Sequence, residues 1–161
     1  ADTGPLHQAL FGVFAAWRRL RPFHWVFLSA LAEGADRAVL DAYAAWARQP
    51  PPLEAYLPFP APEYEKDFTS PESIAQFRNW LSRARALHLP PQPALRPEAY
   101  FQTGRLLADD SDRMLFLWDG QPPRGPGGTA HILQYAREIH KPRAILLLPR
   151  LEVLFEDFPP A

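Results

Sequence analysis

Residues 114–136 read MLFLWDGQPPRGPGGTAHILQYA, and this stretch indicates the fold more clearly than any other part of the chain. It begins with an apolar run, residues 114–118, which is long enough for one buried strand and too short for a helix. A loop with three prolines and four glycines follows at residues 119–128. Thr129 then opens a segment in which apolar residues recur at helical spacing. The stretch therefore predicts a strand, a glycine-rich loop and a helix.

This glycine loop (residues 119–128) has the composition of an anion-binding turn. A strand followed by glycines and a helix start presents backbone N–H groups and a positive helix end, usually to a phosphate. Gly127 and Gly128 have no Cβ, so the backbone can approach a ligand closely. The Thr129 hydroxyl could cap the helix or bond a phosphate oxygen. The alternative is a turn whose glycines only relieve strain, and the stretch alone favours neither interpretation.

The composition favours one folded domain. The chain has 161 residues, of which 47% are hydrophobic, and its 17 basic and 18 acidic residues leave a formal net charge of -1. Nothing in this balance indicates a nucleic-acid or anionic membrane surface. No apolar run approaches the roughly 18 residues of a membrane span, and no secretory leader is visible. There is no cysteine, which excludes disulfides and thiolate metal sites. We expect a cytoplasmic protein without a cofactor or a metal.

Helical and strand-like segments alternate along the chain. The apolar spacing predicts helices at residues 6–20, 35–46, 71–87, 97–108 and 129–140, and strands at 25–28, 53–57, 114–118 and 144–148. Ser70 and Pro71 have the residue types of a helix N-cap and a first helical position. Short apolar strands between helices are typical of an α/β fold with a mostly parallel sheet. We expect a single domain over residues 1–150 and a C-terminal tail at 151–161.

Three candidate loops follow predicted strands directly. They are residues 29–36, 58–64 and 119–129. Ligands of open α/β sheets bind beyond the carboxyl ends of the strands, so the three loops are expected to meet at one edge and form a site.

Several motifs in a fixed order resemble a known family. They are SALAEGAD at 29–36, LPFP at 57–60 with Tyr64 and Asp67-Phe68, Tyr100 with Gly104, Ser111-Asp112, and WDG at 118–120 with GGTA at 127–130. Together, over residues 6–149, they resemble the bacterial branch of the SLOG superfamily. Its members are Rossmann-like domains related to the LOG phosphoribohydrolases, to DNA-processing protein A and to the nucleotide-sensing cytosolic region of melastatin-type TRP channels. The resemblance implies a three-layer Rossmann-like fold.

The resemblance also implies a function. Such domains sense a nucleotide or a nucleotide-derived signal, for example an NAD-derived ADP-ribose or a cyclic nucleotide, often in bacterial conflict or antiviral (antiphage) signalling. The ligand-binding residues implied are Ser29, Ala30, Glu33, Gly34, Ala35, Asp119, Gly120, Gly127, Gly128 and Thr129. Further candidates are Pro58, Tyr64, Tyr100, Arg124 and His131.

Two departures from the family pattern are visible. The family begins with a strand that ends in Thr-Gly-His-Arg and is central in the sheet, whereas only Thr3-Gly4 resembles that turn here. The first strand is therefore missing from the expected fold, unless another segment fills its place; residues 151–155 are the only spare strand-like piece. The second departure is Ile132, which stands where the LOG enzymes carry a glutamate. Ile132 cannot act as an acid or a base, so we expect no catalytic residue of that kind.

Alternatives remain for several residues. Glu33 and Asp36 could contact a ligand or simply complement the dipole of the following helix, and Asp119 could be a turn residue. His131 could donate to a phosphate or lie free on the surface, and Tyr64 and Tyr100 could stack on a base.

An enzyme that cleaves an N-glycosidic bond with Glu33 or Asp119 is the first alternative function. A single-stranded DNA binder is the second, and the near-neutral charge argues against it. Self-association or an effector protein as partner is also considered.

Overall fold

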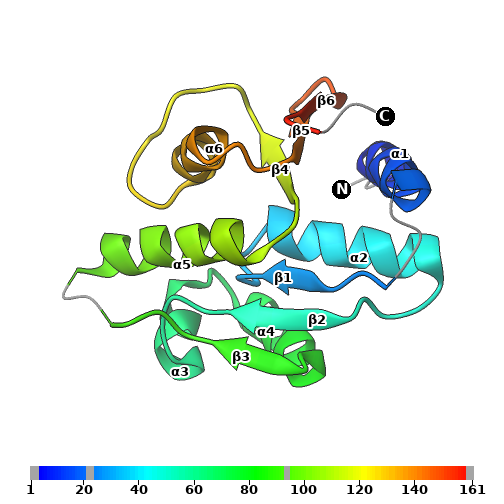
Figure 1. Ribbon diagram of the computed structural model, residues 1–161. Coiled ribbons are helices and arrows are strands. Elements are labelled where there is room, and N and C mark those ends of the chain that lie inside the picture. Colours follow the sequence, from blue (N-terminus) through cyan, green and yellow to red (C-terminus); the bar gives the residue numbers. More distant parts are fainter. Residues whose placement is uncertain (1–3, 21–23, 93–94, 159–161) are drawn as a thin grey trace.

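A computed structural model of the chain describes residues 4–20, 24–92 and 95–158, in which helices and strands alternate (Figure 1). The elements are α1 (Gly4–Leu20), β1 (Phe27–Ser29), α2 (Ala35–Ala47), β2 (Leu53–Tyr56), α3 (Ala61–Tyr64), the 3-10 turn η1 (Glu65–Asp67), α4 (Pro71–Arg83), β3 (Ala86–His88), α5 (Arg96–Asp110), β4 (Met114–Trp118), α6 (Thr129–Glu138), β5 (Arg143–Leu147) and β6 (Glu152–Glu156). The predicted α/β class is confirmed.

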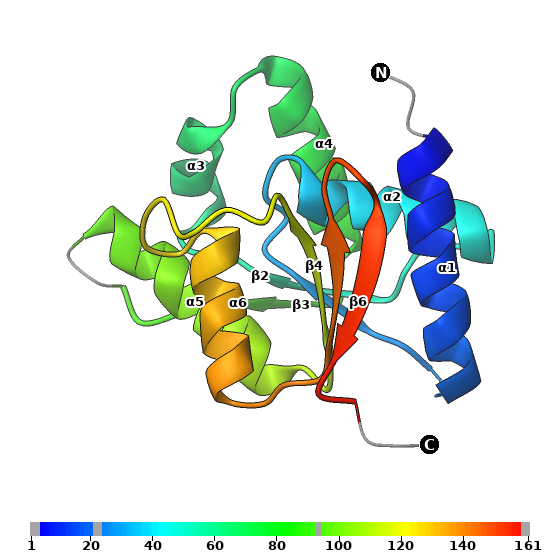
Figure 2. The ribbon, with the colours of Figure 1, turned by 90° about the horizontal axis from the view of Figure 1, so that it is seen from above.

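The strands form two sheets of three strands each, where the sequence predicted one sheet. β1, β2 and β3 are parallel throughout. β4 and β5 are parallel, and β6 pairs antiparallel with β5. Seen from above, the strands of one sheet run across those of the other (Figure 2). β1 and β4 are end strands, each with a single strand neighbour among the described residues.

The strand-like piece at residues 151–155 forms most of β6 (Glu152–Glu156). The chain reverses directly after β5, where the Leu151 N–H donates to the Leu147 carbonyl at 2.7 Å and Leu151 has a φ of 61°. So tight a reversal allows only an antiparallel partner on β5 itself. The interpretation that residues 151–155 fill the place of the central strand is therefore wrong. Residues 152–156, expected to be part of a tail, belong to the second sheet.

The predicted helix at 71–87 is two elements. Its start is as predicted, because the Ser70 hydroxyl accepts a hydrogen bond from the Ser73 N–H at 3.1 Å. The helix ends at Arg83, and residues 86–88 form β3 beside β2. The Arg85 N–H donates to the Leu53 carbonyl at 2.9 Å, so pairing with β2 overrides the helical spacing of the side chains. α3 and η1 were not predicted.

Helices cover both faces of the β4–β5 pair. On one face, Leu10 and Phe14 of α1 pack with Leu146 of β5. On the other face, Leu133 and Ala136 of α6 pack with Ile145. A separate cluster, with Leu31, Leu57, Tyr64, Phe77 and Trp80 among its members, lies under the loops that follow β1 and β2. Within the described ranges, no helix has both the length and the apolar character needed to cross a membrane.

Candidate functional site

The loop after β1 (residues 29–36, the β1 loop) is compact and bonded to itself. Ser29 is 8% exposed, and its hydroxyl accepts from the Leu31 N–H at 3.0 Å. The Asp36 carboxylate folds back to accept from the Ala32 N–H at 3.1 Å, and burial raises its pKa. Gly34 has φ 87° and ψ −115°, a backbone conformation that a residue with a Cβ rarely adopts. Ser29 and Asp36 therefore shape the loop itself.

The β1 loop is also fixed to the start of α4. The exposed Glu33 carboxylate accepts from the Thr69 N–H at 2.9 Å and from the Thr69 hydroxyl at 2.8 Å, and the hydroxyl is the main reason that the pKa of Glu33 is lowered. Arg37, only 5% exposed, donates from Nε to the Leu31 carbonyl at 3.0 Å. Its Nη1 donates to the carbonyl of Ser73 at 2.8 Å and to the hydroxyl at 2.9 Å. Glu33 thus keeps its charge at the rim of a loop that is held in place.

The segment after β2 supplies an aromatic wall. Tyr64 is 1% exposed and packs against Phe68, Phe77 and Tyr100, with ring centroids 4.9, 5.5 and 6.1 Å away. This burial raises the pKa of Tyr64. Pro58 is buried as well. The side chains of Pro58 and Tyr64 therefore belong to the core and are not exposed to a ligand.

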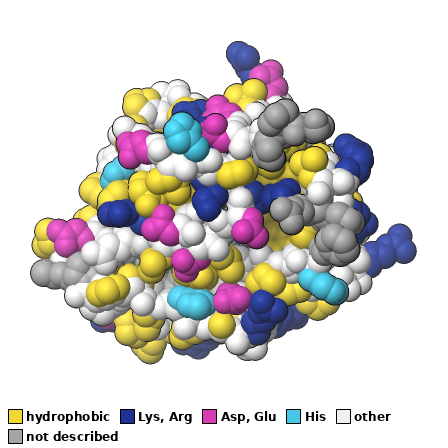
Figure 3. All heavy atoms as spheres, viewed as in Figure 1, with side chains coloured by type: hydrophobic (Ala, Val, Ile, Leu, Met, Phe, Trp, Pro, Cys, Tyr) yellow, Lys and Arg dark blue, Asp and Glu magenta, His cyan; other side chains and the backbone are white. Residues whose placement is uncertain are grey.

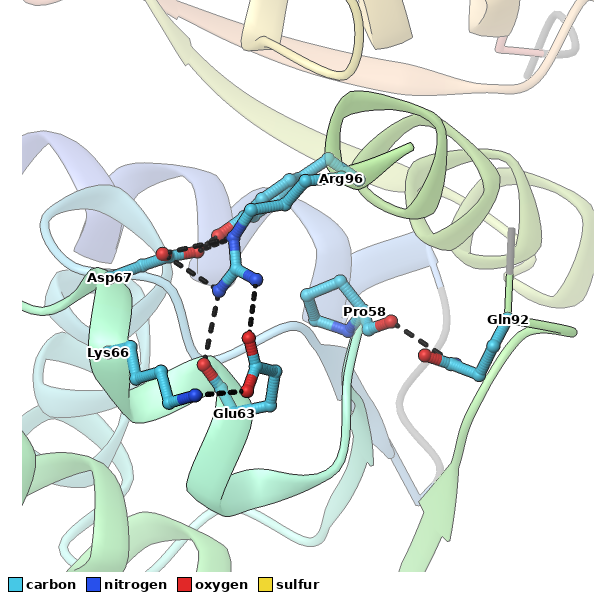
Figure 4. A network of polar contacts seen from close by, with 7 residues as sticks. Pro58, Glu63, Lys66, Asp67, Gln92 and Arg96 are labelled. Carbon is cyan, nitrogen blue, oxygen red and sulfur yellow. Dashed lines mark hydrogen bonds and ion pairs between the residues drawn. The ribbon is translucent and has the colours of Figure 1, made fainter. Parts of the chain in front are cut away.

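A network of charged side chains lies next to these aromatic rings (Figure 4). Arg96, at the start of α5, donates from Nη2 to Asp67 at 2.8 Å and from Nη1 to Glu63 at 2.9 Å, and its guanidinium lies 4.1 Å from the centroid of the Phe59 ring. The Tyr100 hydroxyl donates to Asp67. Burial first, and this hydrogen bond second, raise the pKa of Tyr100. The sequence does not indicate this network, because no local pattern pairs Arg96 with Glu63, which lies 33 positions earlier.

Tyr100 also contacts the glycine loop. Gly127 has a φ of 79°, and a Cβ placed there would lie 2.6 Å from the Tyr100 Cβ and 2.8 Å from the Phe101 nitrogen. Only glycine fits this approach between the loop and the first turns of α5. The Gly127 N–H donates to His131 Nδ1 at 3.0 Å, and the His131 ring stacks on Phe101 with centroids 4.1 Å apart and planes 3° apart. The glycine loop is thus anchored at its end.

The rest of the glycine loop is exposed and bonded only locally. The Asp119 carboxylate accepts from the Gln121 N–H at 3.0 Å and pairs with Arg124 at 2.6 Å, and these contacts, in that order, lower its pKa. The Trp118 indole donates to the Gln121 carbonyl at 2.9 Å. Gly120 has a φ of 79°. Asp119 therefore acts as a turn residue in this structure, and Arg124 is its ion-pair partner.

The two helices that leave these loops begin without a side-chain cap. Gly34 occupies the N-cap of α2 and Gly128 that of α6, and neither helix has a capping side chain. Thr129 is the first residue of α6 and is exposed. It follows the N-cap position, so the alternative that its hydroxyl caps the helix is not what the structure shows. Uncapped N–H groups at a helix start need partners, and an anion is a suitable one.

Ile132, the residue at the position of the LOG glutamate, lies in the core. It is 7% exposed and packs against Gly104 of α5, where a Cβ would collide with the Ile132 side chain. Its side chain therefore joins α5 to α6.

A hollow of about 540 Å³ lies beside α6, next to the glycine loop. It is lined by Trp118, Pro123, Ala130, Leu133, Gln134, Arg137 and Glu138. None of the ten residues that the family resemblance implies contributes to it. Among the described residues, no group of three or more His, Asp or Glu side chains is arranged to hold a metal ion. On the face drawn in Figure 3, acidic, basic and hydrophobic side chains are interspersed.

No model of a known protein family matches the chain, and no curated protein matches it.

Proposed function

We propose that this chain is a Rossmann-like domain of the SLOG type that binds a nucleotide or a nucleotide-derived signal, such as ADP-ribose or a cyclic nucleotide, in bacterial conflict signalling. The ligand lies across the β1 loop and the glycine loop. The order of motifs along the sequence supports the family part of this proposal, and the contacts between the loops support the binding part.

The main support comes from Tyr100. Its ring contacts Phe59 and Tyr64 from the segment after β2, with centroids 5.6 and 6.1 Å away, and its backbone meets Gly127 from the loop after β4. The β1 loop joins the same surface through Glu33 and Thr69. The segments that follow β1 and β2 in one sheet and β4 in the other are therefore joined by packing and hydrogen bonds, which supports a shared site.

The charge pattern of this surface suits the parts of a nucleotide. The exposed Gly128 and Thr129 lie at the uncapped start of α6, which favours a phosphate. Glu33 is ionised and can accept hydrogen bonds from ribose hydroxyls. A phosphate near α6 and a ribose near the β1 loop is the orientation that we propose.

A thermal-shift panel tests the proposal. The panel contains NAD, ADP-ribose, cyclic ADP-ribose, AMP, cyclic di- and trinucleotides, and short single-stranded DNA. A ligand at a hundred times its dissociation constant adds about 2.7 kcal/mol of stability, which is a shift of a few degrees for a domain of this size. We expect at least one nucleotide to give such a shift and the DNA to give none. No shift with any nucleotide would contradict the proposal.

Variants separate specific binding from a general effect. Thr129→Val removes the hydroxyl at the start of α6, and Glu33→Gln removes the charge of the β1 loop. We expect both to reduce the shift. Asp112→Asn is the matched control, since Asp112 is exposed and precedes β4, at the opposite end of that strand from the glycine loop. An equal loss in all three variants would argue against this site.

A further inference from the structure

The hydrogen bond between Gly127 and His131 requires one particular protonation state. A backbone N–H can only donate, so His131 Nδ1 must accept with its lone pair. The proton of the neutral ring therefore resides on Nε2. A second proton would occupy Nδ1, and the imidazolium has no acceptor left. The contact cannot survive protonation of the ring.

The position of the ring makes this contact the anchor of the whole loop. His131 is held flat on Phe101 with planes 3° apart, so it cannot turn its other nitrogen toward Gly127 without leaving the stack. Residues 121–126 are exposed throughout, whereas Gly127 is partly buried against Tyr100 and Phe101. Loss of the hydrogen bond would therefore leave the loop end held to α5 only by the packing of Gly127 on Tyr100 and Phe101, because the other hydrogen bonds of the loop are internal or to the adjacent Trp118.

We propose that His131 is a pH-sensitive latch: as the neutral imidazole it fastens the glycine loop to α5 through the Gly127 N–H, and as the imidazolium it releases the loop. This inference concerns the loop in the free protein and does not depend on the proposed ligand.

The charged groups of the surrounding elements do not replace the contact. On α5 they are Glu98, three residues before Phe101, Tyr100, whose hydroxyl is bonded to Asp67, and Arg105, whose guanidinium lies 5.8 Å from the Phe101 ring. In the glycine loop, Asp119 and Arg124 pair with each other. On α6, the Tyr135 hydroxyl donates to Asp109 at 2.6 Å. Among the described residues, none of these groups is bonded to the His131 ring, so the Gly127 N–H is its one hydrogen-bond partner.

Amide hydrogen exchange, followed by NMR between pH 8 and pH 5, tests the latch. The protection factor of the Gly127 amide, corrected for the intrinsic pH dependence of exchange, should fall about threefold to tenfold as the ring is protonated, which is the loss of one hydrogen bond. The Gly127 amide shift and the His131 ring signals should follow the same titration midpoint. Unchanged protection across this range, or two different midpoints, would overturn the proposal.

Two variants make the test specific. His131→Asn places a carbonyl oxygen at the same number of bonds from the backbone as Nδ1; it accepts a hydrogen bond and does not titrate. We expect Gly127 to stay protected in His131→Asn at both pH values, and to lack protection at both in His131→Ala. A pH-dependent loss of protection in His131→Asn equal to that of the wild type would assign the switch to another group.

Discussion

The two loops that form the candidate site are built in different ways. Glu33 bonds the β1 loop to Thr69, just before α4, and the buried Arg37 of α2 donates both to Leu31 of the loop and to Ser73 of α4. The glycine loop is exposed over residues 121–126 and is anchored at Gly127. The conformation of the β1 loop is thus fixed by contacts with other elements. The glycine loop is held to another element only at Gly127, and its remaining hydrogen bonds are local.

This difference assigns different roles to the loops. A loop that is fixed by buried hydrogen bonds has little conformational freedom left to lose when a ligand binds, so it can present groups in a preset geometry. A loop with one anchor can open and close around a ligand at low cost. Under the proposed function, the β1 loop would present fixed groups to the ligand and the glycine loop would close on it.

The largest expected effect is the loss of Arg37. Arg37→Met leaves the Leu31 and Ser73 carbonyls without their buried donor, which should lower the free energy of unfolding by about 2–4 kcal/mol. Urea denaturation measures this change. Arg78→Met, on the exposed side of α4, is the control and should cost much less. Equal effects in the two variants would remove the distinction between a fixed and a loose loop.

Two neighbouring glycines test the single anchor of the glycine loop. Gly127→Ala brings a Cβ into the Tyr100 and Phe101 backbone at a φ of 79°, and it should destabilise the protein by about 1–3 kcal/mol. Gly128→Ala meets only the Gly125 carbonyl at 3.7 Å, at a φ of −74°, and should be close to neutral. The midpoints of thermal unfolding compare the pair. A Gly128→Ala variant as unstable as Gly127→Ala would contradict this account of the anchor.

A smaller effect, with a defined pH dependence, is expected at Thr69. Hydrogen bonds from Thr69 lower the pKa of Glu33 from its ordinary value of 4.5, so their contribution to stability is fully present above that value and is lost as the pH falls through the lowered pKa. Thr69→Val removes the hydroxyl. The difference in urea midpoint between wild type and Thr69→Val should therefore be larger at pH 7 than at pH 3. A difference that grows on acidification would have the wrong sign.

The smallest effect is expected at the pair of Asp119 and Arg124. Both side chains are well exposed, at 43% and 79%, so Arg124→Gln should leave the unfolding midpoint unchanged within error. Asp119→Asn keeps an oxygen that can accept from Gln121 and should also be silent. A marked destabilisation in either variant would show that the glycine loop has a second anchor.

Much of the fold follows from local sequence patterns. The strand at residues 114–118 has the predicted bounds, and Ser70 caps α4 as its residue type indicates. β3 was missed because it is only three residues long and is defined by its pairing with β2, which no local spacing records. The division into two sheets was missed for the same reason, since pairing between strands is a tertiary property.

In the candidate site, too, local features could be predicted from the sequence and contacts between distant segments could not. The sequence predicts which loops follow strands, and the described structure joins these loops. The contacts that join them could not be predicted: Tyr100 with Asp67, and Gly127 with Tyr100, connect segments that are distant in the chain. Asp119 and Thr129 were candidates by residue type, and the structure bonds the first to its own loop and leaves the second exposed without a capping role.

Hydrogen exchange measured with and without nucleotides tests the central claim most directly. The protein would be measured alone and with NAD, ADP-ribose, AMP or a cyclic dinucleotide. The account predicts slow exchange at residues 31–37 under all conditions, together with new protection at residues 127–131 when one of these nucleotides binds. Protection that is unchanged in both loops with every nucleotide, or new protection confined to other parts of the chain, would contradict it.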